Sequence, residues 1–78
     1  MKAKFKVGSV YLIEFWDHVS GRTEPLKCQV VGWVEKDTEN YVALTWWMPE
    51  DDDEEWVKSN KEPFSIIKST MYRKRKLF

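Results

Sequence analysis

Apolar and polar residues alternate along this chain with a period of two, which is the spacing of β-strands. The alternation starts at Val7 and runs to Trp16, and both faces of that segment carry apolar side chains. A second segment, 26–35, is more one-sided: its predicted core face consists of Leu26, Cys28, Val30, Gly32 and Val34. The opposite face carries Lys27, Gln29, Val31, Trp33 and Glu35. No segment keeps helical spacing over three turns, so the pattern predicts an all-β chain.

Three further strands are expected, at 41–48, 64–68 and 71–78. In 41–48, Trp46 shares a face with Val42 and Leu44, and Trp47 lies on the other face. Turn-forming residues fill 17–25 and 36–40. The segment 49–63 contains six consecutive acids, which repel one another, and it predicts an acidic loop between the third and fourth strands. Gly32, in mid-strand, predicts a bulge or a sharp bend.

Short strands separated by turns favour a sheet that closes into a small barrel, because closure removes exposed edges. The run Val7 to Phe15, the glycine at 32, and the strand, one-turn break and strand from Phe64 to Tyr72 resemble the small-barrel superfold of SH3-like and Sm-like domains. Sm-like proteins carry an N-terminal helix and a late glycine signature, which this chain lacks. The resemblance therefore implies a five-stranded SH3-like or Sm-like barrel and not an RNA-binding ring.

Length, cysteine content and hydropathy limit the class of protein. The chain has 78 residues and is expected to be one domain, 1–78, with five tryptophans supplying large buried areas. Cys28 is the only cysteine, so no internal disulfide forms, and a reducing, cytoplasmic location is expected. No apolar run is long enough to span a membrane, so no membrane association is expected.

Enzyme chemistry is poorly supported. His18 could be a general base and could pair with Cys28, but a histidine in a turn and a cysteine on a core face are the simpler interpretations. The six acids lack the ligand spacing and turn glycine of a calcium loop, and no glycine-rich phosphate loop is present. We expect a non-catalytic protein without a metal or cofactor.

Binding chemistry is better supported. Trp33 lies among polar residues, so its indole could stack on a base while its neighbours donate hydrogen bonds. The acidic run and the basic final strand carry opposite charges within a chain whose net charge is zero, which favours a short ligand over a long polymer. The basic strand could instead pair with the acidic loop. The expected ligand-binding residues are Trp33, Trp47, Trp16, Lys27, Gln29, Arg73, Lys74 and Arg75.

Two functions follow from these residues. The favoured one is a binding module for a nucleotide-type ligand, either a small signalling nucleotide or a short single-stranded nucleic acid. Such a chain would suit a phage or mobile-element protein that sequesters a nucleotide. The alternative is a protein-interaction module that uses the same aromatic face, or a homo-oligomer whose subunits meet through the tryptophans.

Overall fold

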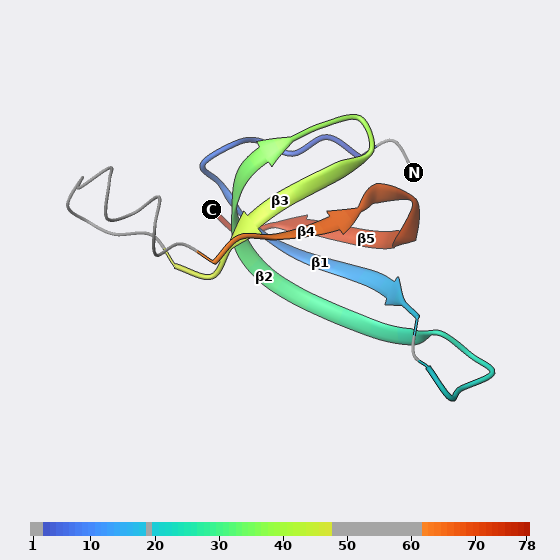
Figure 1. Cartoon of the computed structure of the whole chain (residues 1–78). Helices are drawn as coiled ribbons and strands as arrows, with labels where there is room; N and C mark the ends of the chain where they lie inside the picture. The colour runs from blue at the N-terminus through green and yellow to red at the C-terminus, as the bar shows by residue number, and fades with distance from the viewer. Residues whose placement is uncertain (1–2, 19, 48–61) are drawn as a thin grey trace.

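The computed structural model of this chain describes residues 3–18, 20–47 and 62–78. Five antiparallel strands and one short 3-10 helix make up its regular structure (Figure 1). They are β1 (Val10–Asp17), β2 (Leu26–Asp37), β3 (Tyr41–Thr45), β4 (Phe64–Ile67), η1 (Lys68–Thr70) and β5 (Met71–Lys76). The expected all-β class is confirmed. In the described part of the chain, no helix has the length and hydropathy needed to cross a membrane.

The strands form one sheet in the order β4-β3-β2-β1-β5. β1 pairs with β2 over its whole length and with β5 on its other side. β3 pairs with β2 only from Trp33 to Asp37. The first half of β2 therefore has β1 as its one described neighbour, and the two strands leave the body of the protein as a long hairpin (Figure 1).

Alternation decides which side chains form the core. The odd-numbered residues of β1 and the even-numbered residues of β2 face inward, so the predicted core face of β2 is confirmed for Val30, Gly32 and Val34. Leu26 is an exception, with 40% of its surface exposed, because it lies opposite Asp17 at the far end of the hairpin. The core cluster contains Ala3, Phe5, Tyr11, Ile13, Val30, Val34, Val42, Leu44, Ile66 and Met71.

Gly32 is not at a bulge, which was one of the two features expected of it. The pairing of β1 with β2 runs through it without a shift, and the irregularity of β2 lies between Val34 and Lys36. A Cβ atom at position 32 would lie 2.9 Å from the carbonyl oxygen of Thr45 and 3.2 Å from the Cβ of Leu44. Glycine is therefore required because β3 approaches the backbone closely at this point.

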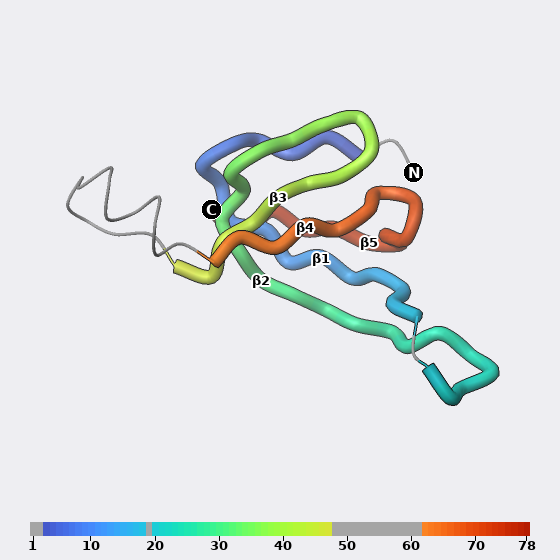
Figure 2. The backbone as a smooth tube through the Cα atoms, viewed as in Figure 1, coloured from blue at the N-terminus to red at the C-terminus, as the bar shows by residue number. Residues whose placement is uncertain are grey.

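The first strand begins at Val10, three residues later than expected. Gly8 adopts a positive φ of 88°, which turns the chain, and its N–H donates to the carbonyl of Val34 at 2.8 Å. The segment before this turn passes beside the end of β2 (Figure 2), and its Phe5 packs edge-on against Tyr11 at 4.9 Å between ring centroids. The N-terminal segment is thus part of the core.

β3 ends at Thr45, whereas a strand as far as Met48 was expected; Met48 lies outside the described residues. The expected acidic loop also lies outside them, apart from Glu62 and Pro63. The expected one-turn break near Ser69 is confirmed as η1 between β4 and β5.

Candidate functional site

Six of the eight expected ligand-binding residues share one face of the strands β2, β1 and β5. In β1, Glu14 lies between Gln29 on one side and Arg73 on the other, and both partners point with it away from the core. The same registers place the remaining members on this side of the sheet. We call this surface the outer face and define it by Trp16, Lys27, Gln29, Trp33, Arg73 and Arg75.

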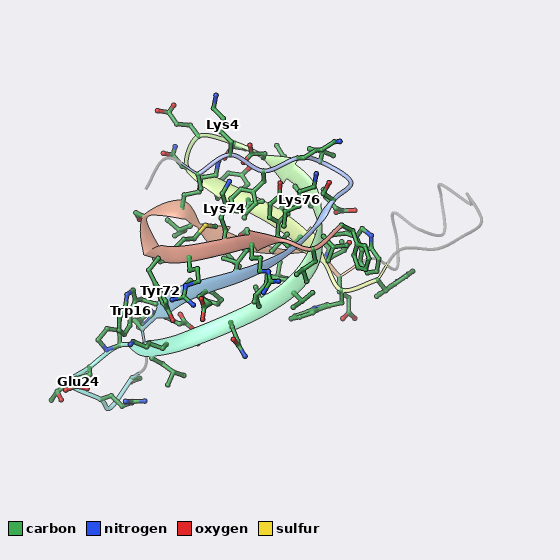
Figure 3. The ribbon with its side chains drawn as sticks, turned by 180° about the vertical axis from the view of Figure 1, so that it is seen from behind. Lys4, Trp16, Glu24, Tyr72, Lys74 and Lys76 are labelled. Atoms are coloured by element: carbon green, nitrogen blue, oxygen red, sulfur yellow. The ribbon has the colours of Figure 1, made fainter. Side chains whose placement is uncertain are left out.

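Trp16 forms an aromatic pair at one end of the outer face. Its ring lies 5.5 Å from that of Tyr72 at a tilt of 47°, and Figure 3 shows the two side chains together. The Lys27 ammonium lies over the Trp16 ring, 5.1 Å from its centroid. Trp16 and Tyr72 are both exposed, so part of each ring faces solvent.

Tyr72 was not among the expected site residues. Alternation along β5 places it with Lys74, on the opposite face from Arg73. However, Glu14 pairs with Arg73 and the next residue, Phe15, pairs with Met71, so Tyr72 is an extra residue at a bulge. A bulge redirects a side chain, and here it places Tyr72 beside Trp16.

The basic side chains of β5 provide the charge of the outer face. Arg73 Nε lies 3.0 Å from Glu14 Oε2, and most of the Arg73 side chain remains exposed. Arg75 lies opposite Leu12 and is also exposed. The expectation that this strand pairs with the acidic run concerns residues outside the described part, whereas the described partner of Arg73 is Glu14.

Trp33 and Trp47 are less exposed than Trp16. Trp33 lies on the outer face as expected, but it is half-buried between Val10 and Thr45 in the neighbouring strands. Trp47 is half-buried as well and follows the end of β3. Trp46, expected on the same face as Val42 and Leu44, is exposed and stacks on Phe64 at 4.3 Å between ring centroids, because the strand ends before it.

Lys74 is separated from the other expected site residues. It lies opposite Ile13 on the inward side of β5, with its ammonium 4.8 Å from the centroid of the Phe5 ring. The ammonium also donates to the Lys4 carbonyl, and Figure 3 shows Lys4 and Lys74 near each other. Lys74 holds the N-terminal segment in place and does not extend the outer face.

A second polar cluster lies away from the outer face, and no motif in the sequence predicted it. Lys68, in η1, is buried, and its Nζ lies 2.6 Å from Asp37 Oδ1. The Phe5 N–H donates to Asp37 Oδ2 at 3.2 Å. Burial raises the pKa of Asp37, but the hydrogen bonds from Lys68 and Phe5 and the positive charges of Lys68 and Lys74 outweigh it, so the pKa lies below its usual value. A cavity of about 400 Å³ adjoins this pair.

Cys28 and His18, named above as a possible catalytic pair, both belong to the β1–β2 hairpin. Cys28 lies opposite Phe15, and His18 follows the last residue of β1, three positions further along the chain. Within residues 3–18, 20–47 and 62–78, no three His, Cys, Asp or Glu side chains converge as a metal site would require. Comparisons with protein families, curated proteins and solved structures found no match for this chain.

Proposed function

We propose that this chain is a non-catalytic binding module whose outer face holds a short single-stranded nucleic acid. One observation supports this most strongly: strand register gathers two indoles, a tyrosine and two arginines on one face of the sheet, with Trp16, Tyr72, Arg73 and Arg75 exposed and Trp33 half-buried. Bases stack on aromatic rings of any sequence, and arginines bind phosphate oxygens with charge-assisted hydrogen bonds. A sheet face that carries both groups can bind a strand along its length.

An SH3-like barrel is the fold we propose for this module. The strand order β4-β3-β2-β1-β5, with the single turn η1 joining the two edge strands, supports that assignment. The free thiol of Cys28 supports the proposed cytoplasmic location.

The dimensions of the outer face favour a strand over a single nucleotide. Trp33 lies opposite Val10, six residues along β1 from Trp16, so the two indoles are about 20 Å apart. One base cannot touch both. The cavity of about 140 Å³ beside Trp16 is smaller than the roughly 300 Å³ or more of a typical small-molecule pocket. An oligonucleotide that spans both indoles uses the whole surface.

The energetics of Trp16 are compatible with stacking. Lys27 covers part of the indole, and a cation over an exposed ring contributes about 0.5–1 kcal/mol. Stacking of a base contributes about 1–3 kcal/mol, so a base can displace Lys27 from the ring. The displaced ammonium then remains close enough to meet a phosphate.

Fluorescence anisotropy with a labelled eight-nucleotide single strand tests the proposal. Replacing Trp16 by Leu should weaken binding about tenfold, because one stacking platform is lost. Trp46→Leu is the matched control, since Trp46 is also exposed but stacks on Phe64, outside the outer face.

The result also separates the two functions. Binding of the single strand that is weakened by Trp16→Leu and unaffected by Trp46→Leu supports the proposal. No binding of oligonucleotides of any composition would overturn it and would favour the protein-interaction module. Binding of a mononucleotide as tightly as the eight-nucleotide strand would overturn the proposed strand ligand.

A further inference from the structure

The first half of β2 presents an open strand edge. β1 occupies one side of β2 from Leu26 to Trp33, but β3 joins the other side only from Trp33 onward. Among the described strands, none pairs with that side between Leu26 and Gly32. Backbone N–H and C=O groups along such an edge can pair with another chain.

Features that usually protect an edge strand are absent from this part of β2. The segment 26–32 contains no proline, and its pairing with β1 shows no bulge. Its one charged residue is Lys27. Leu26 and Val31 are exposed apolar side chains on opposite faces of it. Edges that must stay single normally carry several charges, a proline or a bulge.

We infer that this edge pairs antiparallel with the same edge of a second copy of the chain. Both partners of the pair present the same strand edge, and a two-fold axis between the two copies makes that edge complementary to itself. The chain carries no net charge, so two copies approach without overall repulsion. This inference does not depend on the proposed function.

Two constraints set the register of the paired strands. The core faces of both copies must lie on the same side of the sheet, and the second copy must not collide with β3. A two-fold axis perpendicular to the sheet keeps core faces together, so an even-numbered residue must meet an even-numbered residue. Centring the axis on Gln29 would bring Leu26 of the second copy beside Gly32, next to the end of β3 at Thr45. Centring it on Lys27 would leave only three residues paired on each strand. Centring it on Cys28 pairs 26–30 and stays clear of β3.

This register gives compatible neighbours. Leu26 of each copy meets Val30 of the other, which covers an exposed leucine with the core residue of β2 nearest to the open end of the hairpin. Lys27 meets Gln29, so no like charges face each other. The two Cys28 side chains lie opposite one another. The outer faces of both copies lie on the same side of a continuous sheet.

Light scattering of the purified chain and its variants tests the inference. The wild-type protein should have twice the 9.4 kDa chain mass. Leu26→Asp should give a folded monomer or raise the dimer dissociation constant about tenfold or more, because a carboxylate would face an apolar residue of the second copy. Leu77→Asp is the matched control, since Leu77 has the same 40% exposure as Leu26 and lies outside the edge.

Oxidative cross-linking tests independently whether the two Cys28 side chains face each other in the paired strands. Cys28 is the only cysteine, so a mild oxidant should join two copies through its thiol in the wild-type protein and fail to do so in Cys28→Ser. If Leu26→Asp does not fold, cross-linking of the wild-type protein tests whether the two β2 edges pair. A wild-type mass equal to one chain at all concentrations would overturn the inference. So would a dimer that resists Leu26→Asp and forms no Cys28 cross-link.

The binding of oligonucleotide on the outer face and the pairing of the β2 edges can be refuted independently of each other. Leu26 points to the core side of the sheet, so Leu26→Asp should still bind the single-stranded oligonucleotide through each outer face. Loss of the dimer with binding retained shows that the edge and the outer face act independently.

Discussion

The ion pair between Asp37 and Lys68 offers a direct test of how the fold is held together. It joins the end of β2 to η1, and through the Phe5 N–H it also ties down the N-terminal segment. Asp37→Asn removes one charge and leaves the buried Lys68 ammonium without its partner. Lys68→Met does the reverse, and the double variant removes both charges while the thioether keeps its packing against the Phe5 ring.

The expected magnitudes follow from burial. Removing one partner of a buried ion pair costs about 3–5 kcal/mol, and the lower end applies because the Asp37 side chain is 22% exposed. A chain of this length has a total stability of roughly 4–12 kcal/mol, so either single substitution removes a large share of it. The double variant should lose only about 1 kcal/mol, because no unpaired charge stays buried.

Urea unfolding, followed by intrinsic fluorescence, measures these free energies. The single and double variants together form a thermodynamic cycle, which should return a coupling energy of several kcal/mol between the two residues. The reasoning would be refuted if the double variant lost as much unfolding free energy as the two single variants lose together. It would also be refuted if both single variants unfolded at the wild-type midpoint.

Three further outcomes are expected. The pKa of Asp37 is lower in the folded chain than the unfolded value of about 3.9. The stability that Asp37 contributes is therefore complete above that pH and is lost as the pH falls through the folded pKa. Acid unfolding curves of Asp37→Asn should lack this loss. Gly32→Ala should destabilise the chain by about 1–3 kcal/mol in urea unfolding, because its Cβ would crowd the Thr45 carbonyl, and an unchanged midpoint would contradict that. Tyr72→Ala should weaken oligonucleotide binding severalfold in the anisotropy assay, since it removes the ring beside Trp16, and unchanged affinity would limit stacking to the indole.

Period-two alternation predicts the composition of the outer face well. It places Lys27, Gln29 and Trp33 on one side of β2, and Arg73 and Arg75 on one side of β5, as the structure has them. Antiparallel pairing preserves sidedness from strand to strand, so faces worked out separately within each strand combine into one surface.

Features that break alternation were not predictable in this way. The bulge that turns Tyr72 toward Trp16 shifts the register by one residue and leaves no mark in an apolar pattern. Leu26 has the spacing of a core residue but lies beyond the strands that would cover it. The contact between Asp37 and Lys68 joins residues distant in sequence, and only the assembled sheet brings them together.

The salt dependence of oligonucleotide binding tests the central claim most directly. For single strands, the logarithm of the affinity falls with the logarithm of salt by about 0.7 per phosphate contact. Replacing Arg73 and Arg75 by Gln should therefore reduce that slope by about 1.4. Lys76→Gln, on the opposite face of the same strand, should leave it unchanged. A slope that changes equally for both variants, or not at all, would contradict binding on the outer face.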